Sequence, residues 1–110
     1  MSLEPKKIDL TTINSKEIIK GFHGKFVHMN NMSIAYWDVE KGSEIPIHNH
    51  VHEQIMQVTE GKFELILDGK SQICEPGTVV LIPSFVNHGG KALTDCKITD
   101  VFSPVREAYK

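Results

Sequence analysis

The sequence lacks closely spaced cysteines, long apolar runs and an apolar signal segment. Cys74 and Cys96 are widely separated and form no Cys-x-x-Cys pair, which argues against a disulfide framework or a zinc knuckle. We expect both to be small buried side chains. The longest apolar run, residues 78–83, is far shorter than the ~20 residues that span a bilayer. We therefore predict a cytoplasmic protein with no membrane partner.

A large excess of charge of one sign is also absent. The formal net charge is −2, and the eleven lysines are scattered along the chain without a basic stripe, which argues against a nucleic-acid partner. The 110 residues are 40% hydrophobic and 24% charged, as in one ordinary domain. Folding at this size buries roughly 65% of the unfolded chain's surface, so the core needs no structural metal. Any metal can therefore serve chemistry.

The first part of the chain differs from the rest. We assign residues 1–22 to an N-terminal arm and residues 23–110 to one β-barrel domain. Within the arm, residues 14–21 have the pattern of a short helical turn, with Asn14 or Ser15 as its cap.

Beyond Gly24, short alternating runs are separated by glycine and proline every 8–12 residues or so, a pattern typical of an all-β protein. Asp68-Gly69 predicts a two-residue hairpin, and residues 60–62 predict a second one. Seven or eight short strands joined in this way favour a closed double-sheet barrel of the jelly-roll type.

Three histidines occur within five residues. If this segment is a strand, His48, His50, His52 and Gln54 project to one face, because side chains two apart share a face. Imidazole is the commonest ligand for several transition metals. The alternative is an exposed polar strand end without a function. His88 follows another apolar run and a proline, and supplies a further ligand from elsewhere in the chain.

Two motifs carry a family resemblance. The first comprises Gly42, His48, His50, Gln54 and Gly61, and the second comprises Gly77, Pro83 and His88. Both resemble the motifs of metal-binding cupins, which implies a double-stranded β-helix barrel. The resemblance also implies one divalent transition metal ion (zinc, nickel, manganese or iron) with four ligands: His48, His50, Gln54 and His88. His52 is expected to line the site or its mouth.

Gln54 stands where most cupins have a glutamate ligand. The neighbouring Glu53 should point to the opposite face by strand parity. Neutral ligands leave the full charge of a divalent ion uncompensated, which favours a strong Lewis acid and an anionic substrate. The absence of a carboxylate ligand also disfavours oxygen chemistry at iron.

The C-terminal segment adds an acid and the single arginine. Strand parity places Asp100 on the same inward face as Ile98 and Phe102, where a carboxyl group could act as a general acid or base. The alternative is an acid paired with a lysine. Arg106 has the fork geometry that binds a carboxylate; its alternative is a surface ion pair with Glu107.

Residues 50–54 and residues 100–109 resemble the corresponding segments of the small KdgF-type cupins, which are linked to pectin and alginate breakdown. The resemblance implies that the metal site opens 4,5-unsaturated monouronates to the linear 5-keto-4-deoxyuronate. It also implies that Asp100, Phe102 and Arg106 lie in the pocket. We therefore expect Asp100 and Arg106 to be catalytic, and Arg106, Phe102 and His52 to bind the substrate. Val51 and Ala108 depart from residues common in that group, which leaves room for another substrate.

We therefore expect a metal-dependent isomerase or lyase-type enzyme that acts on a small anionic sugar-like substrate. Two alternatives stay open: a cupin dioxygenase, and a non-catalytic metal- or sugar-binding protein. The apolar Ile8, Leu10 and Ile13 predict that the arm lies across a second copy of the chain in a homodimer. His23 and His28 have no predicted role.

Overall fold

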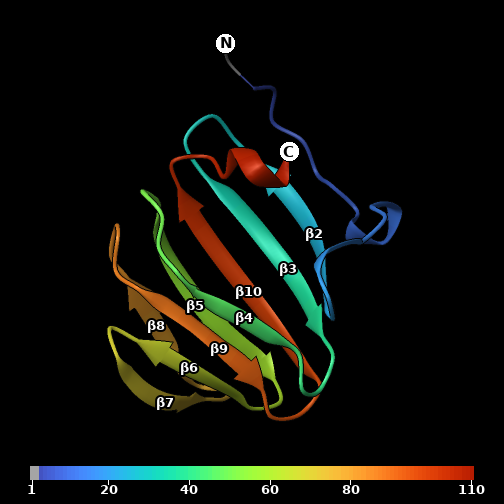
Figure 1. Cartoon of the computed structure of the whole chain (residues 1–110). Helices are drawn as coiled ribbons and strands as arrows, with labels where there is room; N and C mark the ends of the chain where they lie inside the picture. Colours follow the sequence, from blue (N-terminus) through green and yellow to red (C-terminus); the bar gives the residue numbers. More distant parts are fainter. Residues whose placement is uncertain (1–2) are drawn as a thin grey trace.

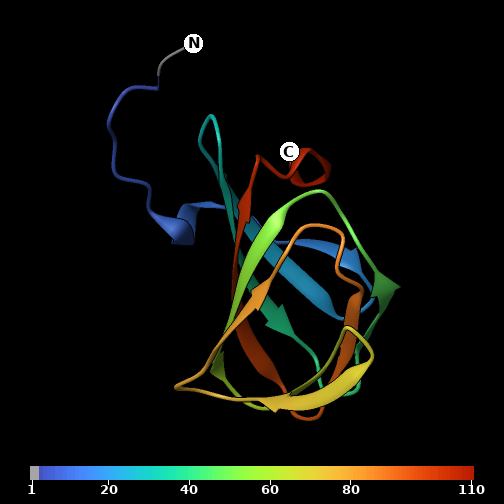
Figure 2. The same ribbon diagram turned by 90° about the vertical axis from the view of Figure 1, so that its left-hand side faces the viewer.

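The computed structural model describes residues 3–110, which form two antiparallel β-sheets facing each other (Figures 1 and 2). One sheet has the strand order β1-β2-β3-β10-β5-β8 and the other β4-β9-β6-β7. The strands are β1 (Lys16–Ile19), β2 (Phe22–His28), β3 (Ser33–Val39), β4 (Glu44–His48), β5 (Glu53–Glu60), β6 (Phe63–Leu67), β7 (Lys70–Cys74), β8 (Val79–Ile82), β9 (His88–Ala92) and β10 (Cys96–Ser103). The predicted all-β jelly-roll fold is confirmed.

The core lies between the two sheets because the long strands alternate in burial. In β10 every second residue from Cys96 is buried, so Ile98, Asp100 and Phe102 point inward as strand parity predicts. Fully burying an aliphatic or aromatic side chain contributes about 1.5–3 kcal/mol, so this alternation stabilises the pairing of the sheets. Both cysteines are free and buried, as expected.

Two of the predicted turns have different outcomes. Asp68 and Gly69 join β6 to β7 as a two-residue hairpin, and both have positive φ (50° and 80°), as a type I′ turn requires. The hairpin predicted at residues 60–62 is wrong, because β5 and β6 belong to different sheets. Gly61 (φ 87°) instead lets the chain cross between sheets, and a Cβ there would clash with the Asp95 carbonyl oxygen.

The helical turn predicted over residues 14–21 is also wrong. Residues 16–19 form β1, which pairs with β2, and a 3₁₀ turn, η1 (Leu10–Thr12), lies earlier in the chain. Asp9 caps η1 by accepting a hydrogen bond from the Thr11 N–H. The sheet edge decides the conformation of β1, since pairing satisfies its backbone groups.

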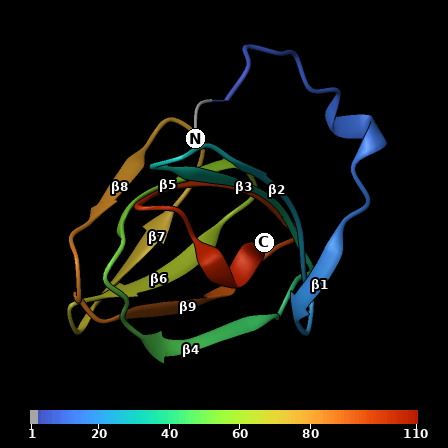
Figure 3. The same cartoon turned by 90° about the horizontal axis from the view of Figure 1, so that it is seen from above.

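The arm before η1 extends away from the body of the molecule (Figures 2 and 3) and exposes Leu3 and Ile8. Residues 1 and 2 of the predicted arm lie outside the described residues. Its docking on a second copy stays a prediction. Neither of the two short helical turns in residues 3–110 has the length and apolar character needed to cross a membrane.

The C-terminus ends at the opening of the barrel. After β10 the chain passes over one end of the two sheets and finishes in a second 3₁₀ turn, η2 (Glu107–Tyr109), which lies across that end in the view from above (Figure 3). We call residues 104–110 the strap. Arg106 lies within it.

Candidate functional site

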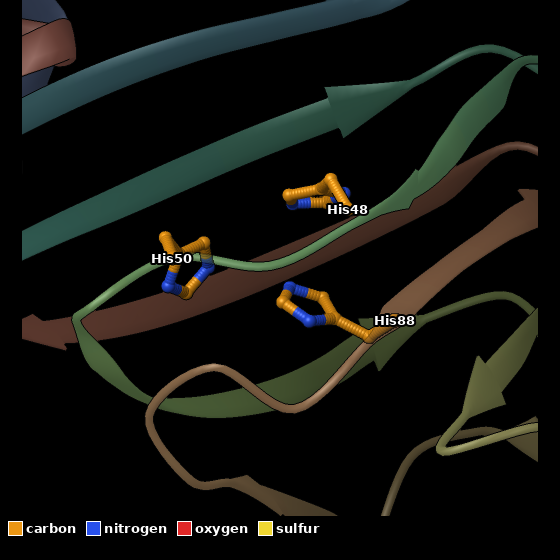
Figure 4. A group of neighbouring side chains, drawn as sticks. All are labelled: His48, His50 and His88. Atoms are coloured by element: carbon orange, nitrogen blue, oxygen red, sulfur yellow. The ribbon is translucent and has the colours of Figure 1, made fainter.

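Three histidines meet at the open end of the barrel (Figure 4). His48 ends β4 and His88 begins β9, directly opposite it in the sheet register, while His50 lies in the connection from β4 to β5. One ring nitrogen from each lies within 4.8 Å of the others. The ring centroid of His88 is 4.3 Å from that of His48 and 4.9 Å from that of His50. The structure thus brings together the three histidines that the sequence motifs selected.

The reason for this convergence differs from the one predicted. His48, His50 and His52 do not share a continuous strand, because β4 ends at His48 and β5 begins at Glu53. The strand-parity prediction for these three residues is wrong. His50 enters the site from a loop, whereas the buried His52 is not among the residues that line the cavity. Gln54 reaches the site from β5, on the opposite sheet, and Glu53 points outward as expected.

Backbone carbonyls fix the orientation of the three rings. The Nδ1–H groups donate to carbonyl oxygens two residues away: His48 to Pro46 (2.8 Å), His50 to His52 (3.1 Å) and His88 to Val86 (2.9 Å). A carbonyl oxygen can only accept, so the hydrogen must sit on Nδ1 and leave Nε2 with a lone pair. Metal-bound histidines usually have such a partner on their other nitrogen.

Gln54 completes the set through a buried hydrogen-bonded chain. Its Nε2 donates to Asp100 Oδ1 (3.0 Å), and Trp37 Nε1 donates to Asp100 Oδ2 (3.0 Å). This fixes the Gln54 amide so that its Oε1 lies 3.1 Å from His50 Nε2. Asp100 thereby orients Gln54, a contact that the sequence did not predict.

The resulting donor set fits a cation. The carbonyl contacts leave three imidazole lone pairs and one amide oxygen facing one space, and His50 Nε2 and Gln54 Oε1 are two acceptors only 3.1 Å apart. Two acceptors at that distance repel unless a proton or a metal ion lies between them. Nitrogen donors of this kind suit divalent transition metals and do not select one among them.

Burial favours the neutral forms of His50 and His88. Desolvation lowers the pKa of His50 to about 4, assisted by the positive charge of Arg106, and desolvation likewise lowers the pKa of His88. The opposite holds for the acid: burial raises the pKa of Asp100 to about 6, against the hydrogen bonds from Gln54 and Trp37, which lower it. At neutral pH the imidazoles of His50 and His88 can therefore bind a metal without first losing a proton.

A cavity of about 330 Å³ adjoins the histidines and is lined by Asp100, Phe102, Arg106 and Tyr109, among others. The Arg106 guanidinium carbon lies 5.6 Å from the Phe102 ring centroid and 5.0 Å from that of Tyr109. No ion pair joins Arg106 to an acid among residues 3–110, so the predicted alternative of a pair with Glu107 is wrong. Its Nε is buried and has no hydrogen-bond partner. Arg106 thus reaches the cavity without a paired carboxylate, and it interacts with Asp100 only at longer range.

Sequence reasoning missed Trp37 and Tyr109. Trp37 belongs to an apolar strand, and nothing in the sequence shows that its N–H meets Asp100, 63 positions away. Tyr109 lies at the chain end, where strand periodicity has stopped; it reaches the cavity through η2. Only the presence of an aromatic residue in this segment could have suggested that Tyr109 packs at the cavity.

A second group of side chains also has a metal-like geometry. His23 Nε2 lies 2.8 Å from Glu40 Oε2 and 3.4 Å from Glu17 Oε2 on the surface of the protein. The hydrogen bond to Glu40 raises the pKa of His23. A carboxylate can only accept, so His23 Nε2 carries the hydrogen in its contact with Glu40 and offers no lone pair to a metal in this arrangement.

Known proteins share this fold. The cupin domain model matches residues 35–102. An RmlC-like cupin from Shewanella frigidimarina is 25% identical over the full length of both chains, with a TM-score of 0.91. KdgF from a Halomonas species is 26% identical over 94% of this chain and 97% of its own, with a TM-score of 0.89. No curated protein matches by sequence. With its two sheets and histidine cluster, the chain belongs to the cupin family.

Proposed function

We propose that the protein opens and tautomerises 4,5-unsaturated monouronates to the linear 5-keto-4-deoxyuronate, with a divalent metal ion held by His48, His50, His88 and Gln54. The observation that carries the proposal is the pairing, in one cavity, of four converging acceptors with an arginine that has no acidic partner. A metal-binding end and an anion-binding end suit a small sugar acid. The similarity to KdgF over nearly the whole chain supports the same substrate class.

Arg106 binds the substrate carboxylate in this proposal. Its guanidinium is held against the faces of Phe102 and Tyr109, so its fork is presented to the cavity in a restricted orientation. Phe102 is 2% exposed and forms an apolar wall beside it. When bound, the metal ion supplies Lewis-acid polarisation of a ring or hydroxyl oxygen.

Asp100 moves the proton. Each of its oxygens accepts one hydrogen bond and retains a further lone pair for a substrate hydroxyl, and its pKa of about 6 allows proton exchange near neutral pH. Ring opening removes the hydroxyl proton at C1, breaks the bond from C1 to the ring oxygen and protonates that oxygen. The enol then gains a proton at C4 and loses its hydroxyl proton. The sequence is redox-neutral, with no net gain or loss of protons.

The test is the ultraviolet absorbance of the conjugated substrate, followed with purified metal-loaded protein. We expect accelerated loss of absorbance, and a loss of ~100-fold in kcat/KM for Arg106→Ala because a charge-assisted bidentate contact disappears. Arg106→Lys is the matched control: it keeps the charge without the fork, and should retain an intermediate rate. Absorbance decay that is unaffected by the metal-loaded protein would contradict the proposal.

The same preparation separates the alternatives. Oxygen consumption that depends on ferrous iron and is absent with zinc would indicate a dioxygenase. Tight uronate binding without turnover would indicate a binding protein. Neither outcome is expected, since the neutral donor set disfavours oxygen chemistry and Asp100 offers a proton-transfer group next to the anion site.

A further inference from the structure

The strap carries Arg106 and Tyr109 to the cavity, yet it belongs to neither sheet (Figures 1 and 3). Its only regular element is the single turn η2. A segment of this kind needs fixed contacts to hold a side chain in one place, because isolated turns are marginal in water. The contacts that hold it involve two histidines without a role in the proposed chemistry.

The first contact comes from His28 and Ser33, which face each other across β2 and β3. His28 Nε2 lies 3.2 Å from the Tyr109 carbonyl oxygen, so this nitrogen must donate. His28 Nδ1 is then an acceptor and takes the hydroxyl hydrogen of Ser33 at 2.7 Å. The Ser33 oxygen in turn accepts from the Arg106 backbone N–H at 2.8 Å. One consistent chain of donors and acceptors thus ties both sides of η2 to the sheet.

The second contact comes from His52. Its Nε2 donates to the Val105 carbonyl oxygen at 3.1 Å, and the ring packs against Phe102 and His50. Val105 itself is 7% exposed. His52 therefore fastens the strap immediately before Arg106, and His28 fastens it at and after Arg106.

The aromatic packing shows what these contacts hold in place. Tyr109 stacks on Phe26 with ring centroids 4.6 Å apart, and it packs nearly perpendicular to Trp37 with ring centroids 5.5 Å apart. The Arg106 guanidinium lies over Tyr109. If the strap detached, Arg106 would lose both its backbone anchor and the ring that restricts its side chain.

We propose that His28, Ser33 and His52 are positioning residues that keep the strap closed over the cavity and thereby hold Arg106 where it binds the substrate. The role of Arg106 rests on the proposed function, whereas closure of the strap does not. Two of the histidines that lack a place in the metal site thus acquire a function at its edge.

Trp37 reports on the strap independently of any substrate. It is the only tryptophan, it is 7% exposed, and its ring packs nearly perpendicular to that of Tyr109. Release of the strap should shift Trp37 fluorescence to the red and increase its quenching by acrylamide. Activity is not needed for this measurement.

The experiment compares three substitutions of His28 in the full-length protein. His28→Ala removes the hydrogen bonds of His28 to Ser33 and to the Tyr109 carbonyl. We expect increased quenching of Trp37 fluorescence and about a fivefold rise in KM for the uronate, because a hydrogen bond contributes about 1 kcal/mol. The kcat should be nearly unchanged. His28→Gln can still reach the Tyr109 carbonyl and should recover most of the closure. His28→Asn keeps only the Ser33 contact and should recover less. His23→Ala, on the same strand, is the matched control and should change neither quantity.

Wild-type quenching and KM in His28→Ala would overturn the proposal, as would a loss of kcat with unchanged KM. Increased quenching in a protein that never converts the uronate would leave the strap assignment standing and would reject the proposed function instead. If His28→Ala fails to fold, His52→Ala carries the same test through the Val105 contact, with Trp37 quenching as the readout.

Discussion

Residues 3–110 contain two groups of side chains whose potential ligand atoms lie within 4.8 Å of one another, but the two groups differ in charge and in where their protons sit. At the barrel opening, carbonyl contacts place the hydrogens on Nδ1, burial lowers the pKa of His50 and His88, and no carboxylate is a neighbour of the free Nε2 atoms in the donor set. On the surface, two glutamates flank His23 and raise its pKa. Spacing alone therefore does not define a metal site. A good site has lone pairs that no proton already occupies.

The largest expected difference between the two groups is in metal affinity. His88→Ala removes one of the converging donors and should weaken binding of zinc or nickel by more than about 100-fold, given that loss of an outer-shell partner alone costs ~10–100-fold. His23→Ala should leave the affinity unchanged. Calorimetric titration of each variant, with metal analysis of the purified protein, measures both. Equal losses in the two variants would show that the surface group binds the metal.

A smaller effect is expected when the donor set receives a charge. Gln54→Glu places a carboxylate beside Asp100, where the amide now donates at 3.0 Å. Two buried acids cannot both ionise at that distance, so the metal-free variant should lose about 1–3 kcal/mol of unfolding free energy. Added metal should restore stability and bind more tightly.

Urea unfolding with and without metal measures this change. The matched control is the double variant Gln54→Glu with Asp100→Asn, in which the new amide can donate to the new carboxylate and stability should return. A metal-free Gln54→Glu protein as stable as the wild type at pH about 8 would contradict the hydrogen-bond direction assigned to Gln54.

The smallest effect concerns pH. His23 has a raised pKa in the folded state, so its contribution to stability is present below the unfolded pKa of 6.5 and is lost as the pH rises through the folded value. His23→Gln should therefore be slightly less stable than the wild type near pH 6 and equal to it near pH 9. Denaturation midpoints at both pH values, with and without added salt, measure this difference. High salt should remove it, because the group is exposed.

The lowered pKa of His50 predicts the opposite dependence of protein stability on pH. Its pKa is lowered from 6.5 to about 4, so its contribution is present above 6.5 and is lost as the pH falls toward 4. Between these values Asp100, whose pKa is raised from 3.8 to about 6, acts in the other direction and offsets part of that loss. For His23, a loss of stability in His23→Gln that grows toward alkaline pH would contradict the raised pKa of that residue.

The sequence predicted the fold class and the donor residues better than it predicted their geometry. Motif spacing identified His48, His50 and His88 because the spacing reflects which loops meet at one barrel end. Local periodicity placed His50 and His52 incorrectly, because it predicts one continuous strand where residues 49–52 form a loop between β4 and β5. The sheet edge converted the predicted helical turn before Gly21 into β1, an effect of tertiary pairing that local propensity does not include.

Long-range partners were beyond sequence reasoning. The inward position of Asp100 followed from parity, but its contacts with Gln54 and Trp37 depend on how three strands align. His28 shows the same limit: its partner at the chain end is 81 positions away. Parity gives the face that a side chain points to, and only the register gives its neighbour.

The donors come from both sheets: His48 and His88 belong to the four-stranded sheet, and Gln54 belongs to the six-stranded one. An ion bound to all of them would therefore connect the two sheets at the open end of the barrel. Such an ion adds to the free energy of unfolding according to its occupancy, about 2.7 kcal/mol at 100 times its dissociation constant. The melting temperature would then report how much of the metal site is filled, and loss of the ion would loosen the two sheets first at the open end of the barrel, beside the cavity.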